Sequence, residues 1–139
     1  RGTEVETRDP VVIRRVLSPE TARIVTDMMV KVVNDGVDGN ASVPGYTIAG
    51  KTGTAQIFTP IGPESRYMMT FVGFLPADDP QISVLVKLDR PTSGQFASQT
   101  AAPVFAGLAQ RLALMMEIPN DDVRRGLVSQ GGVIGGIRR

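Results

Sequence analysis

The sequence predicts an α+β fold in which helices flank an antiparallel sheet. Two segments, residues 19–34 and 103–116, carry apolar side chains at helical spacing, and short β-branched runs lie between them. Short connections between those runs favour antiparallel neighbours, and helices beside such a sheet make a layered α+β domain. The 139 residues, 42% of them hydrophobic, suffice for one ordinary domain or a large part of one.

The first predicted helix has clear ends. It begins at Ser18-Pro19-Glu20, because serine can accept hydrogen bonds from first-turn amides and proline fits the first helical position. It ends at Asn34-Asp35-Gly36, where the glycine can adopt a left-handed conformation. Its apolar face is expected to contain Ala22, Val25, Met29, Val32 and Val33.

The second predicted helix has Pro103 in its first turn and ends at Ile118-Pro119. Its apolar face is expected to contain Val104, Phe105, Leu108, Leu112, Met115 and Met116. Residues 120–139 then lack a periodic pattern, so we expect a weakly packed tail. This divides the chain into residues 1–119, the folded part, and residues 120–139.

Four segments are expected to form strands: residues 11–17, 46–56, 69–75 and 82–88. The last three form an antiparallel meander, with a turn at Asp78-Asp79-Pro80. Residues 57–68 contain two prolines and a glycine and are expected to form a loop. Such a loop is either a plain surface connection or a lid over a substrate cleft.

Charge and composition exclude several classes of function. The chain has 15 basic and 14 acidic side chains, and a net charge of +1 gives no electrostatic case for a nucleic-acid partner. It contains neither His nor Cys, which excludes zinc fingers, thiol nucleophiles and Ser-His-Asp triads within it. Because the chain begins with Arg1 rather than Met, we expect a fragment or a processed product.

One stretch, Gly45 to Thr52, matches the phosphate-loop pattern of nucleotide-binding proteins letter for letter. A phosphate loop must lie between a strand and a helix, because the helix N-terminus supplies amides to the phosphates. Here turn formers precede the stretch, and Gly53, β-branched residues and Pro60 follow it. A nucleotide-binding module is therefore the less favoured interpretation.

The favoured interpretation keeps Lys51, Thr52, Gly53 and Thr54 on an accessible strand. Lys51 supplies a positive charge, and Thr52 and Thr54 lie two apart, so two hydroxyls and a cation on one face suit a carboxylate. Gly53 lets a substrate peptide approach the backbone, and the amide near Thr54 can donate to a developing oxyanion. Lys51 and Thr54 are thus catalytic candidates, and all four are substrate-binding candidates. On composition alone, an exposed lysine in a Gly-Thr turn is a plainer alternative.

A family resemblance favours the catalytic interpretation. Gly50 to Gln56 resembles the third active-site motif of class B penicillin-binding proteins, which are peptidoglycan transpeptidases. Further similar stretches, in the same order, cover roughly residues 11–119: Val16 to Thr21 with Met28-Met29, Pro44 to Tyr46, Thr70 to Pro76, and Ala102 to Phe105. Lys-Thr-Gly alone is a weak signal, whereas the ordered set is a strong one.

The resemblance implies a serine acyltransferase of the penicillin-binding protein and serine β-lactamase fold. A Ser-x-x-Lys motif carries the nucleophile, a Ser-x-Asn motif assists proton transfer, and the Lys-Thr-Gly strand binds the substrate carboxylate. None of the seven serines (18, 42, 65, 83, 93, 98 and 129) has Lys three residues on or Asn two residues on. We therefore expect both motifs on an upstream half of the same domain, and this chain alone to be inactive.

The resemblance also implies the setting of the enzyme. The complete D,D-transpeptidase would cross-link peptidoglycan stem peptides in cell-wall synthesis for division or cell shape, and would be trapped by β-lactam antibiotics. It would lie on the periplasmic face of the cell membrane behind an anchor outside this chain. No metal or organic cofactor is implied. A serine β-lactamase or β-lactam sensor of the same fold, and a non-catalytic fragment that only pairs with its other half, are the remaining alternatives.

Overall fold

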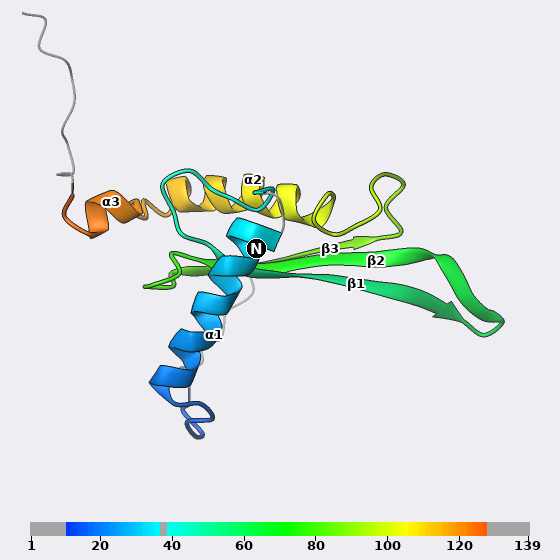
Figure 1. Ribbon diagram of the computed structural model, residues 1–139, viewed down its shortest axis with the longest axis horizontal. Helices are drawn as coiled ribbons and strands as arrows, with labels where there is room; N and C mark the ends of the chain where they lie inside the picture. Colours follow the sequence, from blue (N-terminus) through cyan, green and yellow to red (C-terminus); the bar gives the residue numbers. More distant parts are fainter. Residues whose placement is uncertain (1–10, 37–38, 128–139) are drawn as a thin grey trace, which may run out of the picture.

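The computed structural model describes residues 11–36 and 39–127 of the chain. Helix α1 (Pro19–Lys31) continues into a π-helical turn, η1 (Val32–Gly36). Strands β1 (Ala49–Thr59), β2 (Gly62–Leu75) and β3 (Ile82–Asp89) follow, and then helices α2 (Ala101–Met115) and α3 (Asp121–Arg124). The strands form one antiparallel sheet in the order β1-β2-β3. Figure 1 shows α2 above this sheet and α1 on the other side of it, which confirms the α+β prediction.

The core lies between α2 and the sheet. Phe71 of β2 and Phe105 of α2 are both fully buried, and their ring centroids lie 4.6 Å apart. Gly73 permits this contact, because a Cβ atom there would lie 2.9 Å from the Phe105 ring. The helix otherwise buries small side chains on the sheet: Ala101, Ala102, Ala109 and Ala113.

The expected apolar face of α2 is therefore confirmed for Phe105, holds in part for Leu112, which is half-buried, and is wrong for the other four residues. Val104, Leu108, Met115 and Met116 are all substantially exposed, because the alanine row faces the sheet instead. Small residues let a helix approach a sheet more closely than leucine and methionine would. Periodicity alone could not distinguish these two rows, because both repeat at helical spacing.

Helix α1 confirms the first helix prediction. The Ser18 hydroxyl accepts a hydrogen bond from the Thr21 amide at 3.0 Å, and Pro19 occupies the first turn. The apolar face predicted for residues 19–34 is packed only at its C-terminal end, where Val33 of η1 is buried. No residue of α1 itself is buried among the described residues.

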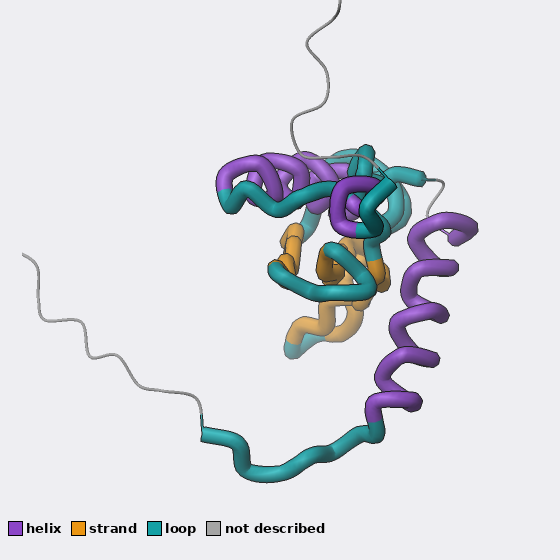
Figure 2. The backbone as a smooth tube through the Cα atoms, turned by 90° about the vertical axis from the view of Figure 1, so that its left-hand side faces the viewer, coloured by secondary structure: helices purple, strands orange, loops and turns teal. Residues whose placement is uncertain are grey.

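The predicted strand at residues 11–17 is wrong. These residues form no regular structure, and Figure 2 shows the segment running away from the sheet before it enters α1. Val11, Val12 and Ile13 are between 84% and 90% exposed. β-branched side chains favour a strand only where a neighbouring strand and a packing surface exist, and the described chain provides neither here.

The predicted loop at residues 57–68 is also wrong. Strand β1 continues to Thr59 and β2 begins at Gly62, so the segment is a long hairpin with a tight turn at its tip. The Thr59 hydroxyl donates to the Gly62 carbonyl oxygen at 2.9 Å, and Gly62 has a φ of +125° that suits glycine. Pro63 is tolerated because β2 pairs with β3 only from Met68 onward, which leaves one side of the hairpin arm open.

The strand predicted from Tyr46 begins only at Ala49, because the preceding residues bond elsewhere. The Tyr46 hydroxyl donates to the Ile118 carbonyl oxygen at 2.6 Å, and the Thr47 amide donates to Asp121 at 2.7 Å. The other expected elements are confirmed: β2 and β3 contain the predicted strands, and residues 78–80 lie in the turn between them.

The expectation of a weakly packed tail from residue 120 is wrong for the described part. Asn120 caps α3 by accepting from the Val123 amide at 2.9 Å, and Asp121 is 7% exposed. Arg124 forms ion pairs with Asp121 and with Asp78 in the β2–β3 turn. The hydrogen bond from Arg124 holds the pKa of the Asp78 carboxyl below its usual range. Residues 128–139 lie outside the described part of the chain, and the division at residue 119 stays a prediction.

Candidate functional site

The four candidate residues lie on β1, which is one of the two edge strands of the sheet in the described chain (Figure 1). In the register, Thr52 is opposite Phe71 and Thr54 is opposite Met69. Directly opposed side chains lie on the same face, so both threonines share the face that α2 covers. Side chains alternate between the two faces along a strand, so the Lys51 side chain lies on the face away from α2, across from Val72 of β2. The prediction that both hydroxyls and the cation start from one face is therefore wrong for Lys51.

The Lys51 ammonium nevertheless returns to Thr52 around the open edge. Its Nζ atom donates to the Thr52 carbonyl oxygen at 3.1 Å and to the Thr52 hydroxyl at 3.2 Å. Both contacts are exposed, and within the described chain no second strand covers this edge. The result is a positive charge with a neighbouring hydroxyl at the rim of the sheet, an arrangement that can receive an anionic group.

The backbone of this strand also presents donors to the open edge. In an antiparallel strand, successive residues direct their N–H and C=O groups alternately to the two sides. The Gly53 carbonyl oxygen accepts from the Thr70 hydroxyl of β2 at 3.3 Å, so Gly53 faces β2. Thr52 and Thr54 consequently direct their amides outward. A peptide that aligns with this edge would meet both amides, and the Thr54 amide could donate to an oxyanion.

Gly53 has a packing role that the sequence interpretation missed. A Cβ atom at this position would lie 2.4 Å from the Thr70 hydroxyl oxygen. Distances below 3.0 Å do not occur for real Cβ atoms, so any larger residue would displace Thr70. Glycine therefore lets the Thr70 hydroxyl keep its place against the Gly53 carbonyl oxygen, whether or not a substrate approaches this backbone.

A cavity of about 480 Å³ lies beside Thr54. Tyr67 and Met69 of β2 form one wall, and Gln95 and Phe96 of the β3–α2 loop form another. The aromatic side chains give this cavity an apolar part next to the polar strand, as is typical of ligand sites. Tyr67 belongs to the 57–68 segment for which the sequence offered a lid over a substrate cleft as one interpretation. No sequence pattern pointed to Gln95 or Phe96, because these residues come near Thr54 only through the fold.

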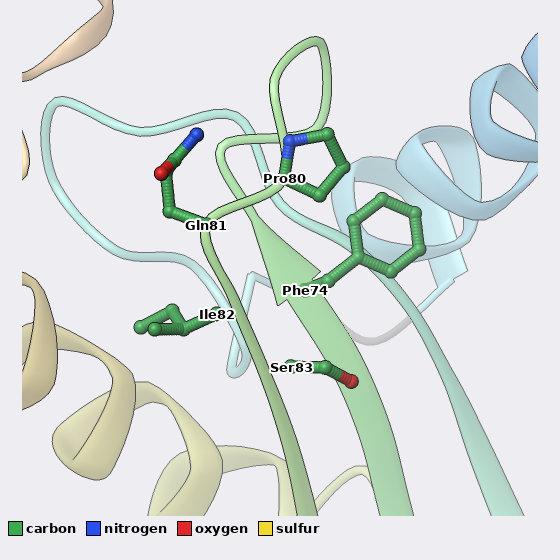
Figure 3. Close-up of a pocket in the computed structure, with 5 residues that line it drawn as sticks. All are labelled: Phe74, Pro80, Gln81, Ile82 and Ser83. Atoms are coloured by element: carbon green, nitrogen blue, oxygen red, sulfur yellow. The ribbon is translucent and has the colours of Figure 1, made fainter. Parts of the chain in front are cut away.

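A second hollow, of about 360 Å³, lies at the β2–β3 turn and is lined by Phe74, Pro80, Gln81, Ile82 and Ser83 (Figure 3). In this view, Ile82 points to the side of α2 and Phe74 points to the opposite side. The hollow lies near the Ala49 end of β1, and its lining contains no charged side chain. It therefore offers less for acid–base or anion chemistry than the Lys51 edge.

The nucleotide-binding interpretation fails on geometry. Residues 49–59, which follow the start of the motif, form strand β1, so the motif does not lead into a helix as a phosphate loop must. Among the described residues, no group of His, Cys, Asp and Glu side chains could hold a metal ion. In the same part of the chain, no helix has the length and apolar character to cross a membrane.

Curated proteins that are similar to this chain include three bacterial relatives. Stage V sporulation protein D of Bacillus subtilis is 37% identical over 106 residues, 75% of this chain and 16% of that protein. Penicillin-binding protein PbpB of Mycolicibacterium smegmatis is 38% identical over 130 residues, covering 85% and 20%. The probable peptidoglycan D,D-transpeptidase PbpC of Pseudomonas aeruginosa is 37% identical over 116 residues, covering 81% and 20%. The chain thus spans about a fifth of the length of these relatives.

Solved structures agree with this result. The transpeptidase domain of penicillin-binding protein 3 from Burkholderia pseudomallei superposes with a TM-score of 0.72 at 36% identity, covering 85% of this chain and 37% of that one. Penicillin-binding protein 3 from Mycobacterium tuberculosis, in a complex with ampicillin, gives 0.71 at 31% identity, covering 95% and 30%. Residues 3–110 match the family described as the penicillin binding protein transpeptidase domain. The chain belongs to this family and is a part of such a transpeptidase domain.

Proposed function

We propose that this chain supplies the Lys51–Thr54 strand to a serine-type peptidoglycan D,D-transpeptidase. The observation that carries the proposal is the exposed Lys51 ammonium beside the Thr52 hydroxyl on an open sheet edge, in a chain of the transpeptidase family. The complete enzyme joins peptidoglycan stem peptides by acyl transfer. An upstream serine oxygen attacks a carbonyl of the donor peptide, the amide bond breaks, and the C-terminal residue leaves as an amine that takes the proton. The acceptor amine then attacks the resulting ester, forms the new amide bond, and returns its proton to the serine oxygen as that leaves.

Each candidate residue has a role in this reaction. The Lys51 ammonium and the Thr52 hydroxyl hold the carboxylate of the donor peptide, because charge-assisted hydrogen bonds favour an anion at this rim. The Thr54 amide donates to the oxygen that gains negative charge in the transition state. Gly53 keeps the strand close to β2 through the Thr70 contact. Lys51 and Thr54 are thus proposed as catalytic, and all four residues as substrate-binding.

The upstream half of the same domain is the proposed partner. The described chain leaves apolar surface uncovered on the side of the sheet opposite α2, where Leu85 is 65% exposed and Val72 is 41% exposed. Ile24, Val25 and Met28 of α1 are also exposed, between 42% and 60%. Apolar surface of this kind favours a covering partner. The motifs that hold the nucleophile in this family are expected on that partner.

β-Lactam antibiotics are proposed as inhibitors that acylate the same serine. Support comes from the Mycobacterium tuberculosis relative, which was solved in complexes with ampicillin and with aztreonam. In such a step, the serine oxygen attacks the β-lactam carbonyl, the ring amide bond breaks, and the ring nitrogen takes a proton. A membrane anchor elsewhere in the protein, a periplasmic location and a role in cell division or cell shape belong to the same proposal.

The test combines this chain with the expected upstream half of the domain, either as one continuous polypeptide or as two separate polypeptides mixed in solution. A fluorescent penicillin should label a serine of the upstream half only when this chain is present. A nucleotide, tested in parallel, should not bind. Labelling of the upstream half at an unchanged rate without this chain would contradict the proposal, because the Lys51 strand would then contribute nothing to acylation.

A further inference from the structure

The residues just before β1, Gly45 and Thr47, are hydrogen-bonded to Asp121 in the segment that follows α2. In Figure 1, α2 leads into α3 at the end of the sheet where β1 begins. The Asp121 carboxylate accepts from the Thr47 amide at 2.7 Å and from the Thr47 hydroxyl at 2.6 Å. We call these two hydrogen bonds the Thr47–Asp121 anchor. The Asp121 amide donates in return to the Gly45 carbonyl oxygen at 2.8 Å, so the contact is reciprocal.

Two arginine side chains, Arg124 and Arg125, hold the Asp121 carboxylate in place. Its Oδ1 atom accepts from Arg124 at 3.2 Å, and its Oδ2 atom lies 3.5 Å from the Arg125 guanidinium. Arg124 also binds Asp78 in the β2–β3 turn, and the Ala77 amide of the same turn donates to the Thr47 carbonyl oxygen at 2.9 Å. The side chains of Asp121 and Arg124 are only 10% and 15% exposed. The carboxylate is thus held between two guanidinium groups and cannot move without breaking this network.

The anchor acts at the start of a strand that, among the described residues, is hydrogen-bonded to a neighbouring strand on one side only. Strand β1 pairs with only one neighbour in the described chain, so its outer edge does not restrain it. Lys51 lies four residues after Thr47, which is about 13 Å along an extended strand. Catalytic groups must be held within about 0.5 Å of the productive geometry, and a displacement of 1 Å can reduce a rate by about a hundredfold.

We infer that Asp121 is a positioning residue for the candidate site: through Thr47 it fixes where Lys51 and Thr54 lie relative to the substrate. This inference rests on the proposed function of the Lys51 strand. It assigns a role in acylation to a residue that lies outside the family match, which ends at residue 110. Asp121 makes no contact with Lys51 or Thr54, so its effect is on geometry and not on charge at the reacting atoms.

The experiment measures acylation of the complete transpeptidase domain by a fluorescent penicillin, with the first-order acylation constant separated from the initial binding constant. Asp121→Asn should lower the acylation constant at least tenfold. Thr47→Val should also lower it, by at least threefold, whereas Thr47→Ser, which keeps the hydroxyl, should stay within twofold of the parent. The double variant Asp121→Asn/Thr47→Val should be no slower than Asp121→Asn, because Thr47→Val removes only the hydroxyl hydrogen bond of the anchor, which Asp121→Asn already weakens by removing the carboxylate charge.

A matched control separates positioning from lost stability. Gln110 is exposed in the middle of α2, and Gln110→Gly lowers stability through helix propensity without touching β1. It should acylate within twofold of the parent. Hydrogen exchange should accelerate at the Lys51 and Gly53 amides in Asp121→Asn but not in Gln110→Gly. If Asp121→Asn does not fold, the Thr47→Val and Thr47→Ser pair decides the question.

The outcomes distinguish this inference from the function on which it rests. If Lys51→Ala is severely slowed while Asp121→Asn and Thr47→Val stay within twofold of the parent, the positioning role is overturned and the proposed function stands. Additive losses in the double variant, or an equal loss in Gln110→Gly, overturn it as well. If Lys51→Ala itself acylates at the parental rate, the proposed function of the strand fails first.

Discussion

The Lys51 ammonium and the Thr52 hydroxyl lie 3.2 Å apart although their side chains start from opposite faces of β1. Only an edge strand allows this contact, because a neighbouring strand would block the path of the lysine side chain. The two residues therefore form one polar unit at the rim of the sheet. The first two predictions concern this unit.

Replacing Lys51 tests the cation. In the complete domain, Lys51→Ala should slow β-lactam acylation by about 10²–10³-fold, by analogy with the loss of one oxyanion-hole donor. Lys51→Arg should not restore full activity, because a planar guanidinium cannot replace a compact ammonium held at the Thr52 hydroxyl. The measurement is the second-order acylation rate, with folding checked by circular dichroism. A folded Lys51→Ala variant within about threefold of the parent would show that Lys51 is not a site residue.

Replacing Thr52 tests the hydroxyl that accepts from Lys51. Thr52→Val should reduce the acylation rate less than Lys51→Ala does, by about tenfold, because the cation remains and only one hydrogen bond to it is lost. Thr52→Ser keeps the hydroxyl and should stay within about twofold. The same acylation assay reports both variants. Equal rates for the valine and serine variants would rule out a role for this hydroxyl.

The isolated chain should form no stable acyl-enzyme with a penicillin. None of its seven serines has the lysine spacing that activates the nucleophile in the family. Intact-mass measurement after incubation with excess penicillin should give the unmodified mass. The control is the joined domain, which should gain one penicillin per molecule. A stoichiometric adduct on the isolated chain would contradict the assignment of the nucleophile to an upstream half.

Two glycines make a matched pair for the packing of α2 on the sheet. Gly73→Ala should lower the free energy of unfolding of the joined domain, because its Cβ atom would lie 2.9 Å from both the Phe105 ring and the Ala49 carbonyl oxygen. Gly107→Ala meets no atom within 4 Å and should stabilise α2 by about 0.5–1 kcal/mol. Urea titration measures both. The packing argument fails if Gly73→Ala is as stable as Gly107→Ala.

The pKa of Asp78, lowered by its hydrogen bond from Arg124, makes stability depend on pH in the acid range. The folded protein holds this carboxyl ionised at a pH where the unfolded chain binds a proton. The contribution is therefore fully present above about pH 4 and is lost as the pH falls through the lower, folded pKa. Asp78→Asn should flatten the decrease of the unfolding midpoint below pH 4. Asp79→Asn, which removes a more distant pair with Arg124, should leave most of that decrease in place.

The sequence predicted the parts of the fold that depend on local signals. Ser18 and Pro19 marked the start of α1, and the antiparallel meander followed from short connections between apolar runs. The hairpin arm was missed because its prolines and glycine lie at the tip and on an open side, where they do not interrupt pairing. Residues 11–17 were overpredicted because β-branched content carries no information about a partner strand.

The candidate site was predictable only where it depends on a local motif. The Lys-Thr-Gly motif is local, and the structure places it on an accessible strand as expected. The Thr47–Asp121 anchor joins residues 74 positions apart, so no local pattern could reveal it. One signal was present: Asn120 followed by two acidic residues is a typical helix start, and it would have identified α3.

The register of β1 shifts between Gln56 and Phe58, after the candidate site and before the hairpin tip. An irregularity at this point separates the strand into an inner length, which contains Lys51 and Thr54, and an outer arm whose partner, the first part of β2, is not paired with β3. Ile61 at the tip is fully exposed. Residues inserted at the tip, such as a peptide tag or a fluorescent reporter, would change the outer arm while the inner length keeps its pairing with β2. The tip at Ile61, rather than the arm that leads to it, is therefore the attachment point for a reporter on this chain.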